Sequence, residues 1–122
     1  MDDCVFCKIV KGELPSSKVY EDDDFLAFLD IRPLSPGHTL IIPKHHYRWV
    51  WDVPNVGAYF EVVKKIALAQ QRAFGASEEI HSKVVGEEVP HAHVWLFPDP
   101  KQTAGDAKDF DGNAEKIRAA LQ

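Results

Sequence analysis

Short segments rich in apolar residues, separated by acidic, proline and glycine turns, occupy the first third of the chain and predict a group of short strands. Residues 18–21 and 25–31 predict two strands joined by an acidic turn, and residues 38–43 predict a third strand that ends at a proline. Residues 4–10 come before them and predict a short helical turn, which the Gly-Glu-Leu-Pro break at 12–15 would end.

The middle of the chain carries one long helical pattern. Over residues 55–74, apolar residues recur at steps of three and four, and Gly75 follows where such a helix would stop. Residues 79–85 and 91–97 alternate again and predict two more strands, while residues 113–121 predict a short C-terminal helix. Because no strand–helix–strand alternation recurs, these elements predict an α+β fold with a mainly antiparallel sheet.

The composition predicts a single globular domain over residues 1–122, with its core at about 4–98 and a tail with a short helix at 99–122. Hydrophobic residues make up 45% of the chain and charged residues 27%, which are ordinary values for a globular protein. No apolar run approaches the roughly 18 residues that span a bilayer, and the acidic start of the chain is unlike a signal peptide. We therefore expect a soluble, cytoplasmic protein with no membrane partner.

The net charge narrows the classes of partner. Fourteen Lys and Arg residues against nineteen Asp and Glu residues give a formal charge of −5. A protein that binds long nucleic acids without sequence preference needs a basic surface for the phosphates, so this class is disfavoured. A small anionic ligand is compatible with the charge, because a pocket lined by backbone N–H groups can hold one phosphate inside an acidic protein.

Cysteine and histidine residues are the first candidates for chemistry. The two cysteines form a C-x-x-C pair, Cys4 and Cys7, and the segments His45-His46 and His91-Ala92-His93 supply imidazoles from elsewhere. Zinc commonly binds two cysteines from such a pair and two histidines from other segments, so the pattern predicts a zinc site. Two alternatives stay open: buried cysteines that act as small hydrophobic residues, and a redox motif, which the lack of a β-α-β pattern disfavours.

His91 and His93 are two residues apart, so on a strand both side chains would point to the same face. If one ring binds a metal ion, the other is held beside it and can act as a nucleophile or a base. The alternative is a pair of histidines on a solvated face. The loop that begins at Gly86, just before this pair, offers backbone N–H groups for an oxyanion.

Asp30 is the next candidate, because it ends an apolar run where a strand would not be expected to carry a charge. It is either an acidic residue in a turn at the end of the strand or a carboxylate that accepts hydrogen bonds from a pair of ligand hydroxyls.

Four stretches of the chain, in the same order, resemble the histidine triad (HIT) family. They are CVFCKIVKGELPSSKVYED at residues 4–22, LAFLDI at 26–31, PGHTLIIPKHH at 36–46 and VPHAHVWLF at 89–97. The likeness covers about four-fifths of the chain, from Cys4 to about Pro98. It implies a HIT-like antiparallel sheet meander with one long helix and a short C-terminal helix, usually paired into a homodimer.

The resemblance also implies roles for particular residues. A purine nucleotide or nucleotide conjugate would bind with its ribose hydroxyls at Asp30 and its base beside Phe6, Phe28 and Ile31. His93 matches the middle histidine of the family, which attacks the α-phosphorus and forms a nucleotidyl-histidine intermediate. In zinc-bearing members the structural Zn²⁺ cofactor is held by residues that match Cys4, Cys7, His46 and His91, with His45 as a neighbour.

Two positions depart from the family pattern. The third histidine of the triad is Trp95 here, and in the segment Gly86-Glu87-Glu88-Val89-Pro90-His91 a glutamate, Glu88, takes the place of the serine that would contact the phosphate. An indole N–H can donate a hydrogen bond but cannot act as an acid. A carboxylate beside a phosphate is repulsive by roughly 1 kcal/mol or more.

The sequence therefore predicts a HIT-type hydrolase or nucleotidyl transferase that cleaves a P–N or P–O–P bond at the α-phosphate of a nucleoside 5′-phosphate derivative. Gly86, Glu88 and Trp95 are expected at the phosphate. One alternative is a weakly catalytic or non-catalytic nucleotide-binding module stabilised by zinc. A second alternative is a zinc-stabilised dimer whose partners are proteins.

Overall fold

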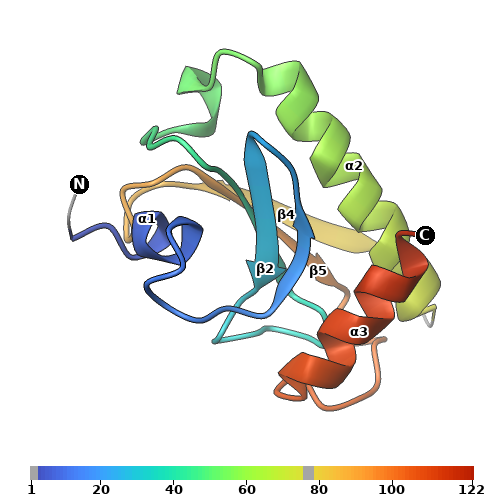
Figure 1. The fold of residues 1–122 in the computed structure, drawn as a ribbon. Coiled ribbons are helices and arrows are strands. Elements are labelled where there is room, and N and C mark those ends of the chain that lie inside the picture. The colour runs from blue at the N-terminus through green and yellow to red at the C-terminus, as the bar shows by residue number, and fades with distance from the viewer. Residues whose placement is uncertain (1–2, 76–78) are drawn as a thin grey trace.

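The computed structural model describes residues 3–75 and 79–122. In chain order its elements are α1 (Val5–Val10), β1 (Lys18–Glu21), β2 (Phe25–Leu29), β3 (Thr39–Pro43), the 3-10 helix η1 (Val50–Asp52), α2 (Val56–Ala73), β4 (Ile80–Val85), β5 (His93–Pro98) and α3 (Phe110–Ala120). A five-stranded antiparallel sheet in the order β1-β2-β3-β5-β4 confirms the predicted α+β class (Figure 1). In the described part of the chain, no helix is both long and apolar enough to cross a membrane.

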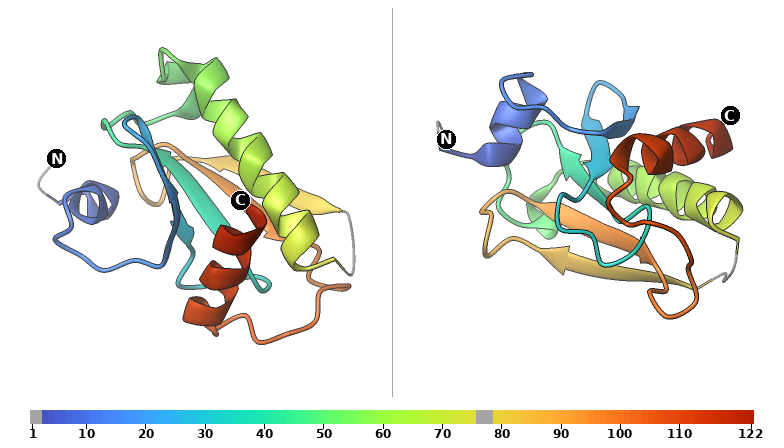
Figure 2. Two further views of the ribbon diagram at one scale, coloured as in Figure 1. Left: turned by 45° about the vertical axis from the view of Figure 1, so that its right-hand side comes forward. Right: turned by 90° about the horizontal axis from the view of Figure 1, so that it is seen from below.

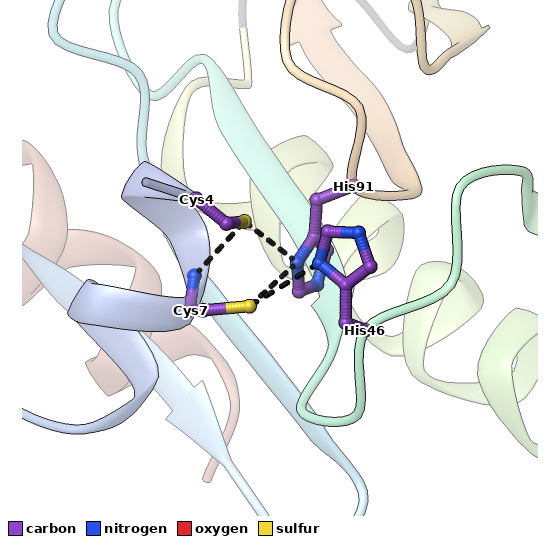
Figure 3. Close-up of side chains that lie close together, drawn as sticks. All are labelled: Cys4, Cys7, His46 and His91. Atoms are coloured by element: carbon purple, nitrogen blue, oxygen red, sulfur yellow. Dashed lines mark hydrogen bonds between the residues drawn. The ribbon is translucent and has the colours of Figure 1, made fainter. Parts of the chain in front are cut away.

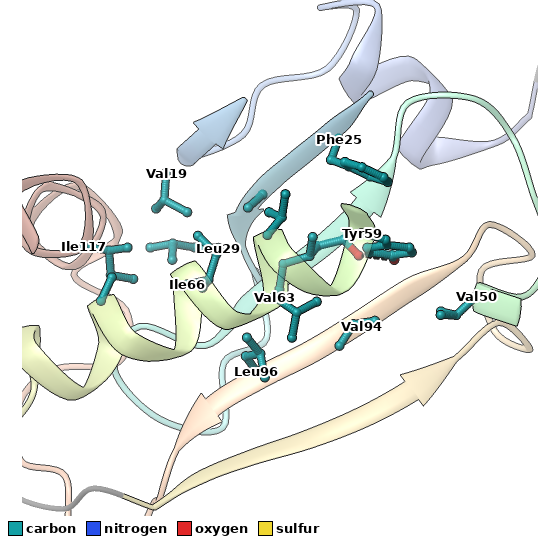
Figure 4. Close-up of a cluster of buried hydrophobic side chains, with 14 of the residues drawn as sticks. Val19, Phe25, Leu29, Val50, Tyr59, Val63, Ile66, Val94, Leu96 and Ile117 are labelled. Carbon is teal, nitrogen blue, oxygen red and sulfur yellow. Dashed lines mark hydrogen bonds between the residues drawn. The ribbon is translucent and has the colours of Figure 1, made fainter. Parts of the chain in front are cut away.

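One face of the sheet is closed by α2 and α3. Strand residues that point to this face form a core with helix residues, and the members include Ala27, Leu29, Ile41, Val94, Leu96, Tyr59, Ile66 and Ile117 (Figure 4). The Tyr59 hydroxyl donates a hydrogen bond of 2.6 Å to the backbone carbonyl of Ile41, which ties α2 to the sheet. Burial of this apolar surface is the main source of stability for the fold.

The opposite face is covered only in part. Figure 2 (left) shows α1 on one side of the sheet and α2 with α3 on the other. Phe6 and Ile9 of α1 pack there against strand residues, which are Leu26, Phe28, Leu40 and Ile42. A helix of six residues is about 9 Å long, whereas five strands span about 19 Å. This face of the sheet therefore has room for a cleft beside α1.

The predicted strands and helices are present, but some boundaries differ. The strand predicted at residues 25–31 is shorter in the structure. β2 ends at Leu29, so Asp30 lies just after it. The reason is that pairing with β3 stops at Leu29 and Thr39, and the Asp30 N–H then donates to the carbonyl of His38 as the chain turns. α3 begins at Phe110, earlier than predicted.

The start of α3 follows from a local hydrogen bond that the apolar pattern does not show. The carboxylate of Asp109 accepts a hydrogen bond from the Gly112 N–H and caps the helix.

The prediction that His91 lies on a strand is wrong, because β5 begins at His93. The His91 N–H donates to the carbonyl of Val89 and the Ala92 N–H donates to the carbonyl of Tyr47, so this segment turns before it joins the sheet. The alternative of two histidines on a solvated face is also wrong, since His91 is 0% and His93 is 5% exposed. The two imidazoles enter different surroundings instead of sharing one strand face.

Candidate functional site

Cys4, Cys7, His46 and His91 come together at the start of α1 (Figure 3). Their two sulfurs and two ring nitrogens all lie within 4.8 Å of one another. The Cys4 sulfur is 3.3 Å from His91 Nδ1, while the Cys7 sulfur is 3.3 Å from His46 Nδ1 and 3.5 Å from His91 Nδ1. The C-x-x-C spacing brings the sulfurs together because Cys4 is the N-cap of α1 and accepts a hydrogen bond from the Cys7 N–H.

This set of donors fits a zinc ion. Tetrahedral zinc with Zn–S bonds of about 2.3 Å and Zn–N bonds of about 2.0–2.1 Å places sulfur and nitrogen ligands about 3.5 Å apart. The separations of 3.3 to 3.5 Å between these sulfurs and ring nitrogens agree with that spacing. Burial and the neighbouring Cys4 raise the pKa of the Cys7 thiol to about 11, so a cation at this point is what would favour the thiolate.

A hydrogen bond behind the cluster fixes the ring of His91. Its Nε2–H donates to the backbone carbonyl of Pro43 at 2.8 Å, so Nδ1 keeps its lone pair toward the two sulfurs. Burial lowers the pKa of His91 to about 4, which keeps the ring neutral, as a metal ligand must be. His45 is exposed and contributes no atom to the cluster.

His93 uses the other ring nitrogen, Nδ1, for its hydrogen bond to the backbone. Its Nδ1–H donates to the backbone carbonyl of His91 at 2.7 Å, so the lone pair is on Nε2. The edge of the Phe6 ring packs against the imidazole, with 4.9 Å between the ring centroids. Burial lowers the pKa of His93, although the His91 carbonyl and the charges of Asp30 and Glu88 oppose this shift. The imidazole is therefore neutral at neutral pH and has one nitrogen free to act as a nucleophile.

An apolar cleft of about 300 Å³ lies beside His93, between α1 and the sheet. Its lining includes six of the residues predicted to bind substrate, which are Phe6, Phe28, Asp30, Ile31, Glu88 and Trp95. Ile31 stands at the rim, since 76% of its surface is exposed. The seventh predicted residue, Gly86, lines a neighbouring cleft instead. A Cβ on Gly86 would lie 2.5 Å from the Arg48 carbonyl oxygen, so this glycine is required for close packing.

Asp30 combines the two roles that the sequence left open. Its Oδ1 accepts a hydrogen bond of 2.9 Å from the Arg32 N–H, as a turn residue does, and the side chain also lines the cleft. Its Oδ2 lies 3.6 Å from Nε2 of His38, a residue to which the sequence analysis gave no role. His38 is 1% exposed, and its Nδ1 accepts a hydrogen bond of 3.1 Å from the Leu34 N–H. Its Nε2–H consequently faces the carboxylate of Asp30.

The five-stranded antiparallel sheet, the Cys₂His₂ cluster and the adjoining cleft define a small α+β protein with four potential metal-binding side chains beside an apolar cleft. The chain belongs to the HIT domain family, which it matches over residues 11–102.

Relatives with named activities are among the matches. The chain is 36% identical over 104 residues to an adenosine 5′-monophosphoramidase of Saccharomyces cerevisiae, a match that covers 84% of this chain and 66% of the relative. It is 41% identical over 103 residues to an adenylylsulfatase of Arabidopsis thaliana, which covers 80% of this chain and 52% of that longer relative.

Two solved structures show the same fold. A HIT-like protein from Bartonella henselae has a TM-score of 0.86 at 37% identity, and the match covers 98% of both chains. A zinc-bound histidine triad family protein from Mycobacterium smegmatis has a TM-score of 0.84 at 33% identity, and the match covers 98% of this chain and 94% of that one.

Proposed function

We propose that this protein hydrolyses or transfers the nucleotidyl group of a nucleoside 5′-phosphate derivative through a covalent nucleotidyl-histidine at His93. The observation that carries this proposal is the hydrogen bond from His93 Nδ1–H to the His91 carbonyl, which leaves a neutral Nε2 in a ligand-sized cleft. Two relatives with named activities, a monophosphoramidase and an adenylylsulfatase, support the same type of reaction.

The cleft offers suitable contacts for a mononucleotide. The carboxylate of Asp30 is placed to accept hydrogen bonds from the two ribose hydroxyls, and the rings of Phe6 and Phe28, with centroids 5.6 Å apart, offer an apolar surface for the base. The α-phosphate would then lie near His93, with Trp95 and Glu88 at its other side. Trp95 stands where the resemblance places the third histidine of the triad.

Zinc has a structural role in this proposal. Cys4, Cys7, His46 and His91 would hold it and would tie α1 to the segment before β5, with no position left for a catalytic water. The zinc-bound relative from Mycobacterium smegmatis supports this assignment. The chemistry then belongs to His93, which is next to the metal site and does not belong to it.

The alternative is a nucleotide-binding module with little or no turnover, and a specific observation favours it. Trp95 Nε1 is buried with no hydrogen-bond partner among the residues the structure describes, and indole cannot transfer a proton. The carboxylate of Glu88 also lines the cleft, where it would repel a phosphate by roughly 1 kcal/mol or more.

The deciding experiment is the intact mass of the protein after incubation with adenosine 5′-phosphoramidate and, separately, with adenosine 5′-phosphosulfate, each followed by rapid acid-free quenching. We expect an added adenylyl group that peptide mapping assigns to His93. We also expect Trp95→His to increase the rate of adduct formation, by up to about 10²-fold, and the exposed Trp51→His to leave it unchanged. If these proteins bind AMP but none of them forms an adduct, the proposed enzyme is ruled out and the nucleotide-binding module is the better account.

Homodimer formation is part of the same proposal. β4 is an edge strand, and exposed apolar side chains lie on it and on the solvent side of α2, namely Val84, Val56, Phe60 and Leu68. Edge strands and apolar helix faces of this kind favour pairing with a second copy. Sedimentation velocity should give the mass of a dimer, and Phe60→Lys should shift the protein toward the monomer.

A further inference from the structure

A second cleft, of about 390 Å³, adjoins the first and shares His93, Trp95 and Glu88 with it. Its other walls come from β4, from the loop after β4 and from the segment before η1, with Lys83, Val84, Val85, Gly86, Glu87 and Trp49. Gly86 allows the Trp49 ring to pack closely against this wall of the cleft, because a Cβ at Gly86 would lie 2.9 Å from the ring. His93 thus stands where the two clefts meet.

We infer that Lys83 binds the leaving group in this second cleft and thereby selects nucleotide substrates whose leaving group is an oxyanion. The inference rests on the proposed function and adds the class of substrate to it. The substrates would be mixed anhydrides of a nucleoside 5′-monophosphate with an oxyacid, in preference to phosphoramidates.

Lys83 is held at the second cleft by the sheet. It pairs with Trp95 across β4 and β5, so both side chains point to the same face as His93. The ammonium group lies over the indole, with Nζ 5.1 Å from the ring centroid. Among the described residues that line this cleft, Lys83 is the one Lys or Arg, and it forms no ion pair with any described carboxylate.

The two clefts match the geometry of substitution at phosphorus. The attacking atom and the leaving group lie roughly in line on opposite sides of the phosphorus. With the nucleoside at Asp30 in the first cleft and the phosphate beside His93, the second cleft is the space that remains for the leaving group. Glu87 and Glu88 bring negative charge to this cleft, and Lys83 supplies the positive charge that offsets it where the leaving group gains negative charge.

The chemistry of departure distinguishes the two classes of substrate. In the first step the lone pair of His93 Nε2 forms a P–N bond, and the bond from phosphorus to the leaving oxygen breaks with its electrons on that oxygen. A sulfate, phosphate or carboxylate leaves as a stable anion and needs no proton. An amine from a phosphoramidate must gain a proton as it leaves, and Trp95 cannot supply one.

The second step restores the enzyme. Water attacks the phosphorus of the nucleotidyl-histidine, the P–N bond breaks with its electrons on Nε2, and the nucleoside monophosphate is released. The proton that the water loses passes to the His93 ring and then to solvent. Lys83 takes no part in this step, because the leaving group has already gone.

The test compares kcat/KM for adenosine 5′-phosphosulfate and adenosine 5′-phosphoramidate, which carry the same nucleotide and differ in the leaving group. Lys83→Met removes the charge and keeps the length of the side chain. We expect it to lower kcat/KM for the phosphosulfate by about 10- to 100-fold, the size of a charge-assisted contact, and to change the phosphoramidate value by less than about threefold.

Two variants control the test. Lys83→Arg keeps the positive charge and should retain most of the activity toward the phosphosulfate. Lys65→Met removes another lysine that lies over an aromatic ring, 5.7 Å from the centroid of Tyr20 and outside both clefts, and should change neither substrate. AMP affinity should stay the same in all four proteins.

The outcomes separate this inference from the proposed function. Equal losses for both substrates in Lys83→Met, or no loss for either, would overturn the role of Lys83 while leaving the enzyme intact. A wild-type protein that prefers the phosphoramidate would also overturn it. Failure of the wild-type protein to cleave either substrate would overturn the proposed function and this inference together.

Discussion

His91 and His93 lie two residues apart, yet the surrounding chain uses the two imidazoles in opposite ways. His91 directs Nδ1 at two sulfurs and donates Nε2–H to the carbonyl of Pro43, so both of its nitrogens are occupied inside the protein. His93 donates Nδ1–H to the carbonyl of His91 and keeps Nε2 for the cleft. The same side chain has contacts at both ring nitrogens in one place and keeps one nitrogen open to the cleft in the other.

The difference comes from the backbone carbonyl that each ring meets. A carbonyl can only accept a hydrogen bond, so it decides which ring nitrogen carries the proton and which keeps the lone pair. The carbonyl of Pro43 meets the far nitrogen of His91, and the carbonyl of His91 meets the near nitrogen of His93. Phe6 packs roughly perpendicular to both imidazoles, with its ring centroid 5.8 Å from that of His91 and 4.9 Å from that of His93.

Removal of the proposed nucleophile, His93, should have the largest effect on activity. His93→Ala should lower the rate of nucleotide cleavage by at least about 10⁴-fold, because His93 is the one histidine among the described residues that line the two clefts. AMP affinity and zinc content, measured by calorimetry and by metal analysis, should stay close to wild type. His45→Ala, at an exposed histidine of the same chain, should change none of these quantities. A His93→Ala protein that still forms a nucleotidyl adduct would show that the nucleophile is elsewhere.

Removal of zinc tests the proposed role of His91 as a metal ligand that stabilises the fold. Chelation should lower the unfolding free energy of the wild-type protein by about 3 kcal/mol, because a ligand at 100 times its dissociation constant stabilises a fold by that amount. His91→Ala should abolish this dependence on zinc and should unfold at a lower denaturant concentration. The midpoint of urea unfolding, with and without a chelator, measures both effects. A wild-type midpoint that does not respond to chelation would contradict a structural metal at this cluster.

A substitution at Asp30 tests whether its carboxylate binds the nucleotide in the cleft. Asp30→Asn keeps the size of the side chain and its hydrogen bond with the Arg32 N–H but loses the charge that strengthens contacts to ribose hydroxyls. We expect nucleoside monophosphate affinity to fall by about 1.5–3 kcal/mol. The matched control is Asp106→Asn, since Asp106 accepts the same type of hydrogen bond from the Lys108 N–H, at 2.9 Å, and lines neither cleft. Unchanged AMP binding in Asp30→Asn would remove this carboxylate from the site.

Much of this arrangement could be predicted from the sequence, because local pattern and family resemblance determine it. Short apolar runs predict β2 and β3, alternation predicts β4 and β5, and the C-x-x-C spacing with two later histidines predicts the cluster of Cys4, Cys7, His46 and His91. The position of His91 could not be predicted from the pattern, since the HAHVWLF pattern begins at His91, two residues before the start of β5. The turn that replaces the strand is set by a local hydrogen bond to the Val89 carbonyl and by one to the Tyr47 carbonyl, which only the fold brings near.

Two residues of the site were missed for a similar reason. Lys83 acquires its place from the register of β4 against β5, which brings it opposite Trp95, and no local motif marks it. His38 acquires its role from contacts on both sides of a turn: the Leu34 N–H at one ring nitrogen and the Asp30 carboxylate near the other. The one available signal was a histidine at the start of an apolar strand, where burial of a polar ring needs partners.

His38 gives the smallest and most specific prediction. Burial lowers its pKa, and the charge of Asp30 opposes this shift without reversing it. Protonation of His38 Nδ1 would also remove the acceptor of the Leu34 N–H and would leave two N–H donors facing each other. In the unfolded chain a histidine has a pKa of about 6.5, so below that pH the unfolded state binds a proton that the folded state does not. The contribution of His38 to stability is therefore present above about pH 6.5 and is lost as the pH falls toward the lowered folded pKa, with a slope of at most about 1.4 kcal/mol per pH unit.

Urea unfolding of the wild type and of His38→Gln across pH 5 to 7.5 would measure this slope. All other ionisable groups are common to both proteins, so their contribution cancels in the difference between the two curves. The variant should be less stable at pH 7.5, because glutamine does not reproduce the contact with the Leu34 N–H, yet it should lose less stability than the wild type on acidification. His45→Gln, at an exposed position, should keep the wild-type slope. Parallel curves for the wild type and His38→Gln would show that this buried ring is protonated as readily in the folded protein as in the unfolded chain.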